Sequence, residues 1–509
     1  MNDFVPCLVP PPLPTEEEGG DLSARGSVLL DTTAYISAAA VSNGTTAIGE
    51  LSTGRRIHVS LCLARPPRLS YLCAHFPGPA LPPSGTRYLR SGTPAVRCIK
   101  EAPQVISTHA DLALLRVPLP GALDLCNPRR HDYFVYTARP GGPFTLDRLP
   151  HPHPKGAAFQ DNEVAIFRCS SGDGTSSRYI IAGLRNTVDG NKFKLQRYDS
   201  NTCLPVHAPV RDDVLPIPST ATELVFHDTT KAIVLGGPRA TIGWVDLWRG
   251  ILFCDVLDKN PVLRDVPLPK PARANRRFFC RGDPHCYREI AVVTLPAGHA
   301  EIKYVEMETR PGEDLPPPRQ PVDSDDDSAS DDDNDDLHVA PYWKATIWTM
   351  PVPIGSWKDW HKDRDRRVDV TDILVDNPRH CDLLLPLPRL STDPESAAMS
   401  LRRLLTCYPT LELDANGELV IYLLSKGDSM YKEGWVIAVG ARDKKLRGIA
   451  ELDIRKNKYF RRYYHHTDIS KYLMDSTAPF QSIPKLRVSR TITGDYQLRP
   501  TTPQGFGAA

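Results

Sequence analysis

The chain has 509 residues, 41% of them hydrophobic, and a formal net charge of +1. This length allows a large buried core, and the 49 prolines and 33 glycines favour short strands joined by turns over long helices. No apolar run approaches the roughly 18 residues of a membrane span, and no signal segment opens the chain, which predicts an intracellular protein of the cytoplasm or nucleus. The twelve cysteines include no CxxC pair, so no metal site and no cofactor is predicted.

Composition divides the chain into four segments. Residues 1–25 are a Pro-rich leader that we expect to be disordered, and residues 26–480 form one domain. Residues 311–340 are an acidic insertion in that domain, also expected to be disordered because it has almost nothing apolar to bury. Residues 481–509 are expected to be a flexible tail.

A hairpin, that is, two strands joined by a turn, recurs along the chain. Looser versions begin at 58 (HVSLCLARPPRLSYLCAHFPG), 133 (YFVYTARPGGPFTLDRLP), 193 (FKLQRYDSNTCLPVHAPV) and 344 (KATIWTMPVPIGSWKDWH). Two closer versions begin at 251 (ILFCDVL) and 435 (WVIAVGA), and each runs through an Asp-Lys turn into a strand that contains Leu-Arg. The sequence therefore predicts six copies of one hairpin.

Each of the two closer copies extends to a four-stranded meander. In the first, KAIVLG at 231–236 precedes a strand in which Trp244, Asp246 and Trp248 alternate with apolar residues, and Gly250 supplies a break where positive φ is allowed. In the second, Asn416-Gly417 predicts a tight type I′ turn.

Four-stranded units that repeat are stable when they pack radially, because neighbours then cover their apolar faces. We therefore predict an all-β, β-propeller-like fold of six four-stranded antiparallel blades, with seven blades or two β-sandwiches as alternatives. Helix is scarce, with candidates only at 395–408 and 468–475.

Three stretches carry a resemblance to a known family: SVLLDTTAYI, IHVSLCLARPPRLSYLCAHFPG and GWVDLWRGILFCDVLD. Over about residues 26–455 the chain resembles the family of domain of unknown function 1618, expanded in cereal grasses. That resemblance implies a plant protein with a propeller-like body and implies no activity. A weaker likeness to F-box-associated propeller domains rests on Trp348 and Trp357, but no F-box-like helical segment precedes the body.

The sequence contains no GxSxG, HExxH, Walker or strand-linked GxGxxG motif, so no catalytic residue is predicted. We call Trp244, Asp246, Trp248 and Gly250 the structural signature. The two indoles are predicted to lie on one strand face, where we favour packing in the core over a ligand platform. A buried Asp246 needs turn amides or an arginine as partners. We favour a non-enzymatic scaffold for an unidentified protein partner, and the alternative is an enzyme whose site is assembled in the central channel from separate blades.

Two segments of the chain are strongly charged. Residues 444–466 hold eight bases with aromatics between them, which makes nucleic-acid binding a further, less favoured alternative. Residues 323–336 hold nine aspartates, and without them the chain would carry +10. Ser324, Ser328 and Ser330 each have Asp three residues downstream, the pattern of acidic-directed kinases, and are candidate phosphorylation sites.

Overall fold

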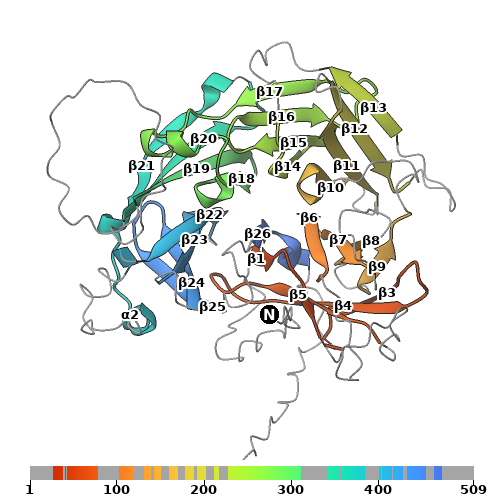
Figure 1. Cartoon of the computed structure of the whole chain (residues 1–509), viewed down its shortest axis with the longest axis horizontal. Coiled ribbons are helices and arrows are strands. Elements are labelled where there is room, and N and C mark those ends of the chain that lie inside the picture. Colours follow the sequence, from red (N-terminus) through yellow and green to blue (C-terminus); the bar gives the residue numbers. More distant parts are fainter. Residues whose placement is uncertain are drawn as a thin grey trace, which may run out of the picture.

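A computed structural model of the protein contains six four-stranded sheets arranged around one axis (Figure 1). The structure describes residues 27–37, 40–41, 43–77, 102–119, 131–138, 143–150, 160–169, 178–187, 192–201, 211–216, 227–310, 342–355, 357–384, 401–402, 404–414, 416–427, 433–453 and 464–472. The predicted six-bladed propeller is thereby confirmed. The acidic insertion, with its three candidate serines, and both terminal segments outside 27–472 lie outside the described residues.

Five blades share one plan, in which the first strand lies nearest the axis and the following strands run outward by antiparallel pairing (Figure 1). Their strands are, in blade II, β6 (Gln104–His109), β7 (Leu112–Pro118), β8 (His131–Thr137) and β9 (Thr145–Arg148); in blade III, β10 (Val164–Arg168), β11 (Tyr179–Asn186), β12 (Lys192–Asp199) and β13 (Arg211–Pro216); in blade IV, β14 (Lys231–Gly236), β15 (Thr241–Asp246), β16 (Gly250–Asp255) and β17 (Leu263–Pro267); in blade V, β18 (Arg288–Thr294), β19 (Ala300–Arg310), β20 (Tyr342–Pro351) and β21 (His361–Asp369); in blade VI, β22 (Leu405–Leu413), β23 (Leu419–Lys426), β24 (Glu433–Gly440) and β25 (Leu446–Asp453).

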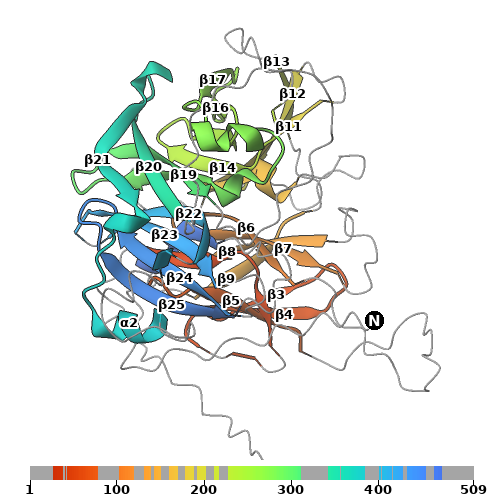
Figure 2. The same ribbon diagram turned by 60° about the vertical axis from the view of Figure 1, so that its left-hand side comes forward.

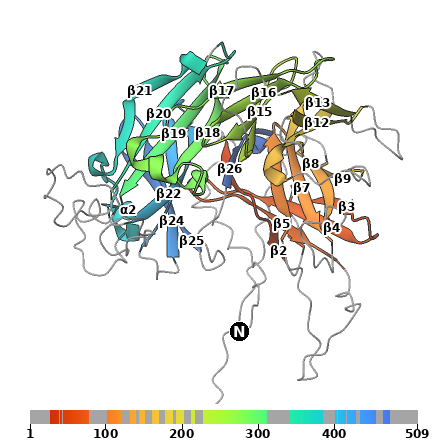
Figure 3. The same cartoon turned by 45° about the horizontal axis from the view of Figure 1, so that its top comes forward.

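Blade I departs from this plan and closes the ring. Its sheet has the order β2–β5–β4–β3, with β2 (Tyr35–Ile36), β3 (Ala47–Glu50), β4 (Arg56–Cys62) and β5 (Tyr71–His75), and β2 pairs with β5 in parallel. Strand β1 (Val28–Asp31) precedes it and belongs to a separate two-stranded sheet. On the axial side β1 pairs antiparallel with β26 (Tyr464–Thr467), from the far end of the described chain (Figures 1 and 3). The prediction of purely antiparallel blades is therefore wrong for this blade, because β2 runs parallel to β5.

All six predicted hairpins are present. They are the strand pairs β4–β5, β8–β9, β12–β13, β16–β17, β20–β21 and β24–β25. The two closer copies match at the same sequence position. Strand β17 begins at Leu263 and β25 begins at Leu446, and these are the leucines of the two Leu-Arg pairs.

The Asn416-Gly417 turn joins β22 to β23, as predicted, but it is not type I′. Only Gly417 has a positive φ, of 76°. The Asp414 side chain instead organises the turn, because its Oδ1 accepts from the amides of Asn416 (2.8 Å) and Glu418 (2.9 Å). An Asx-type turn therefore replaces the pair of left-handed residues that the dipeptide predicted.

The apolar core lies between blades. Separate clusters of buried side chains join blades I and II, II and III, III and IV, IV and V, and V and VI, and another joins blade VI to β1 and β26. Each sheet is thus covered on both faces by its neighbours, which explains continuous apolar runs such as that of β16.

Helical segments are short and lie in connections: η3 (Asp161–Glu163), η4 (Arg273–Phe278), η5 (Pro284–Cys286), η6 (Trp357–Asp359), η7 (Val370–Asp372), α2 (Pro378–Leu384) and η9 (Ile469–Tyr472). The helix predicted over 395–408 is wrong at its end, because residues 405–408 open β22, although 401–402 are helical. The one predicted over 468–475 corresponds to η9. Among the described helices none has the length and apolarity to cross a membrane.

Candidate binding site

Trp244 joins two blades. It lies on β15 with no exposed surface, inside the cluster between blades III and IV. Its indole Nε1 donates to the carbonyl oxygen of Glu163 at 2.8 Å, and Glu163 ends η3 just before blade III. The indole therefore fills a place between blades and leaves nothing for a ligand to stack on.

Trp248 has a different position from the one expected. Strand β15 ends at Asp246, so Trp248 lies in the following turn and not on a strand face shared with Trp244. Its Nε1 donates to the carbonyl oxygen of Gly282 at 3.1 Å, and its ring lies 4.8 Å from the Arg288 guanidinium. Trp248 thus connects blade IV to the segment that leads into blade V.

Asp246 organises that turn. Its carboxylate accepts from the amides of Trp248 (2.9 Å) and Asp228 (3.0 Å), and Arg249 Nε lies 3.9 Å away. Burial raises the pKa of Asp246, and the two amide donors oppose that rise. These are the amide and arginine partners expected of a buried aspartate in this position.

Gly250 has a packing role in place of the expected conformational one. It begins β16 without a positive φ, and a Cβ there would lie 2.8 Å from the carbonyl oxygen of Val266. The close approach of β17 is therefore what requires glycine at this position.

Polar side chains from four elements meet near the axis. Lys231 on β14 forms an ion pair with Glu289 on β18, and its Nζ also donates to the carbonyl oxygen of Ile290 at 3.1 Å. His285 of η5 places Nδ1 3.8 Å from the other Glu289 oxygen. His465 on β26 lies near Lys231, Glu289 and His285. We call these four residues the axial cluster.

The pKa values of Glu289 and His465 do not suit acid–base catalysis near neutral pH. Burial pushes the pKa of Glu289 upward, but Lys231 and His285 outweigh it and hold the pKa at about 2. Burial, with Lys231 adding to it, lowers the pKa of His465 to about 4. A general acid or base works best when its pKa is near the operating pH, and neither group meets that condition. The cluster is a fixed ion pair beside a neutral imidazole.

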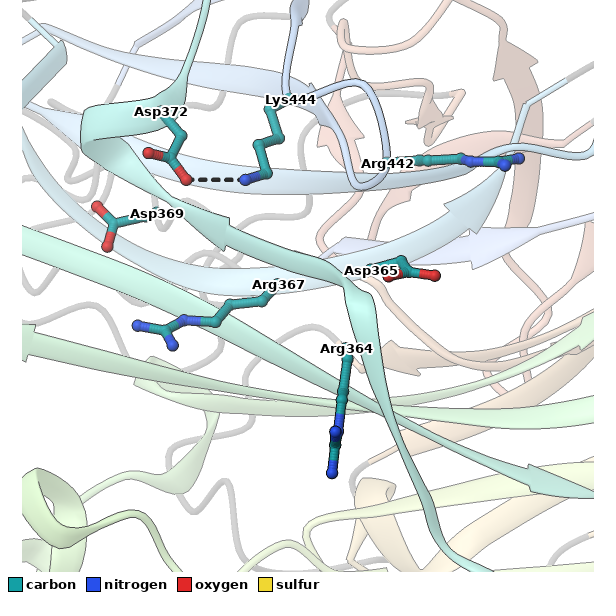
Figure 4. Close-up of a pocket in the computed structure, with 7 residues that line it drawn as sticks. All are labelled: Arg364, Asp365, Arg367, Asp369, Asp372, Arg442 and Lys444. Atoms are coloured by element: carbon teal, nitrogen blue, oxygen red, sulfur yellow. Dashed lines mark hydrogen bonds and ion pairs between the residues drawn. The ribbon is translucent and has the colours of Figure 1, made fainter.

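A cleft of about 540 Å³ opens on the rim, between the outer strand of blade V and the turn that joins β24 to β25 (Figure 4). We call it the rim cleft. Four of its lining side chains come from β21 itself, the outermost strand of its sheet: Arg364, Asp365 and Arg367, which are exposed, and Asp369. The others are Asp372, Arg442 and Lys444.

Two of the three acidic side chains that line the rim cleft are engaged by neighbouring residues. Asp369 accepts from the hydroxyl groups of Tyr342 and Thr371, and Asp372 pairs with Lys444 at 2.8 Å. Figure 4 shows Asp372 and Lys444 facing each other, while Arg364 and Arg442 extend away from them. Arg442 is 70% exposed and lies 3.7 Å from Glu418. The arginines are therefore the groups that an incoming ligand would meet.

The basic run 444–466 does not form one free basic face where the structure describes it. Lys444, Lys445 and Arg447 pair with Asp372, Asp376 and Asp414 respectively, at 2.7–2.8 Å. Residues 454–463 lie outside the described residues, and His465 lies in the axial cluster. No group of three metal-ligating side chains occurs in the described parts of the chain.

Local sequence motifs could not reveal either cluster. The axial cluster draws on residues from 231 to 465 that only ring closure brings together. A signal for the rim cleft does exist in HKDRDRRVD at 361–369, a strand whose charges alternate in sign, but its partner turn lies some 75 residues away.

Comparison with known proteins identifies a family over part of the chain. Residues 244–422 match the family described as "Protein of unknown function (DUF1618)", which confirms the family predicted from the sequence. The matched stretch begins at Trp244 and runs through blades IV and V into blade VI. No curated protein matches the sequence.

Solved structures with some likeness include an Aleuria aurantia lectin in complex with Fucα1-6GlcNAc, at 8% identity and TM-score 0.28, covering 80% of this chain and 94% of the lectin. A Penicillium chrysogenum α-L-arabinanase complexed with arabinobiose has 9% identity and TM-score 0.26, covering 85% and 99%. A protein from Dyadobacter fermentans has 11% identity and TM-score 0.29, covering 80% and 95%. At these TM-scores the likenesses carry no functional argument.

Proposed function

The chain carries a DUF1618 segment within a six-bladed propeller, and we propose that it is a non-enzymatic scaffold that binds an acidic segment of a partner protein in the rim cleft. We also propose a plant origin and a place in the cytoplasm or nucleus, where its cysteines would stay reduced. The observation that carries the proposal is the set of exposed arginines around a cleft in which two of the three carboxylates, Asp369 and Asp372, are already engaged.

Three features of the rim cleft support an acidic peptide. Arg364, Arg367 and Arg442 present guanidinium groups that can bind carboxylates through two hydrogen bonds each. Strand β21 is the outermost strand of blade V, so an extended segment can lie along it (Figure 2). The blades beneath are rigidly packed, so little ordering of the scaffold is needed on binding.

The test is a fluorescence-anisotropy titration of the intact protein with a labelled Asp/Glu-rich peptide. The double variant Arg364→Glu/Arg367→Glu should weaken binding about tenfold or more, because charge-assisted hydrogen bonds contribute about 1.5–3 kcal/mol and 1.4 kcal/mol is tenfold. The matched control is Arg148→Glu/Lys192→Glu, which makes the same charge change at exposed positions on blades II and III. Equal weakening by both double variants would show unspecific attraction and contradict the proposal.

An enzyme with a central site is the competing function. In the axial cluster, Glu289 is an ion-paired carboxylate and His465 is an imidazole that is neutral at pH 7, so neither has a pKa suited to acid–base catalysis there. The scaffold therefore has the stronger support.

A further inference from the structure

The connection from β17 to β18 is strongly basic and exposed. Between 270 and 281 it contains five bases and no acid, and all five are exposed: Lys270, Arg273, Arg276, Arg277 and Arg281. Within the described residues none of the five forms an ion pair with a carboxylate. We call residues 270–281 the η4 surface, after the 3-10 helix that they contain (Figure 1, in green, entering blade V).

Aromatic rings accompany these charges. Phe279 is 41% exposed, which is unusual for a phenylalanine, and packs edge-on against Trp248 at 5.9 Å. Phe278 stacks on Tyr287 with ring centroids 5.0 Å apart, and the Arg277 guanidinium lies 4.6 Å from the Phe278 ring centre. Flat faces and positive charges thus alternate on one short segment.

The η4 surface is held in place from below. Asn275, 1% exposed, donates from Nδ2 to Glu306 (2.9 Å) and to the carbonyl oxygen of Met307 (2.7 Å). Glu306 also accepts from the Ala272 amide and forms a fully buried ion pair with Arg288 at 2.9 Å. Arg288 in turn lies under the Trp248 ring. The segment is therefore preorganised, and the Trp248 of the signature forms part of its support.

We propose that the η4 surface binds single-stranded nucleic acid. The arginines and the lysine would pair with phosphates, and bases would stack on Phe279 and on the Arg277–Phe278 pair. An acidic peptide would also pair with the arginine and lysine side chains, but it would leave the exposed Phe279 ring without a stacking partner. Every nucleobase, in contrast, has a flat face that can stack on this ring. This function is distinct from the proposed peptide binding, because no residue of the η4 surface lines the rim cleft.

The test uses the intact protein and a fluorescein-labelled oligothymidine, with its duplex form and heparin as comparison ligands. Phe279→Ala should weaken oligothymidine binding at least about fivefold, since stacking contributes roughly 1–3 kcal/mol per base, and leave heparin binding unchanged. Arg276→Gln/Arg281→Gln should weaken both and reduce the magnitude of the salt slope by about one. Arg148→Gln/Lys192→Gln is the matched control and should change neither.

Two results would overturn the proposal. One is oligothymidine binding no tighter than that of the duplex and insensitive to Phe279→Ala, which would show attraction to any polyanion. The other is the absence of oligothymidine binding at low salt by the wild-type protein, with a melting curve that shows the protein to be folded. Peptide binding at the rim cleft should be unaffected by Phe279→Ala, so failure of one proposal is distinguishable from failure of the other.

Discussion

Single buried side chains join one blade to the next in this propeller. Trp244 reaches the carbonyl oxygen of Glu163, Trp248 reaches that of Gly282, and Arg288 donates to the carbonyl oxygen of Leu247 at 2.9 Å. Each contact links consecutive blades of the ring, or a blade to the segment that leads into the next one, across 34 to 81 residues of chain. The energy of such a residue therefore belongs to the assembled ring and not to its own sheet.

Trp244→Ala and Trp248→Ala should each destabilise the protein strongly. Truncating a buried tryptophan costs about 3–5 kcal/mol, and both residues also lose a hydrogen bond between blades. Urea unfolding would measure the change, with Ile48→Ala, at a residue 59% exposed, as the control expected to stay close to wild type. Wild-type-like unfolding of both tryptophan variants would contradict the core assignment.

Buried histidines should make stability depend on pH. Burial, with Arg249 adding to it, lowers the pKa of His227 to about 3, whereas an unfolded histidine has a pKa of 6.5. Between these values the unfolded chain binds the extra proton, so the free energy of unfolding should rise with pH over this window and level off above it. His227→Phe should flatten the urea-unfolding profile between pH 4 and 6.5, and an unaltered profile would show that His227 does not titrate as described.

At the scale of elements, the strands that belong to repeated hairpins could be predicted from the sequence, and the irregular strand pairs could not. The six hairpins were found because the strands alternate or run apolar between clear turn residues. The parallel β2–β5 pair has no such signal, since β2 has only two residues, and the wrong helix over 405–408 came from an apolar periodicity that tertiary pairing with β23 overrides.

Gly417→Val should lower the melting temperature and the soluble yield. Gly417 has φ of 76°, which a β-branched residue resists, and a Cβ there would lie 2.8 Å from Pro296 Cγ in the blade V hairpin. Gly54→Ala, at a φ of 78° with open space around it, isolates backbone strain from that clash. The valine variant should therefore be destabilised more than the Gly54 variant, and equal effects would refute the contact with Pro296.

For the whole molecule, composition and repeats predicted the fold class and the number of blades, but not the sites. Residues such as Lys231 and His465 are ordinary surface or strand residues in sequence, and become a cluster only when the ring closes. The positive charge of the η4 surface is visible in the sequence RANRRFFCR. Charge alone, however, does not show which arginine or lysine side chains have carboxylate partners. That distinction separates it from the run 444–466, where acids elsewhere in the chain neutralise the described bases.

Deleting residues 323–336 should increase binding to polyanions. The deletion removes nine negative charges and leaves a chain of net charge +10, while the described blades are untouched, so the melting temperature should change little. Heparin-column retention at low salt measures the effect, and phosphorylation at Ser324, Ser328 and Ser330 should move it the opposite way. Unchanged retention would mean that the acidic run does not shield the basic surfaces.

The pairing of β1 with β26 also sets a schedule for biosynthesis. Strand β1 leaves the ribosome early, but its axial partner is encoded more than 400 residues later. At about 5–20 residues per second, translation takes on the order of half a minute or more to supply it, so β1 must wait that long without its antiparallel partner. Nascent chains halted just before β26 should therefore be the form of this protein that chaperones hold longest.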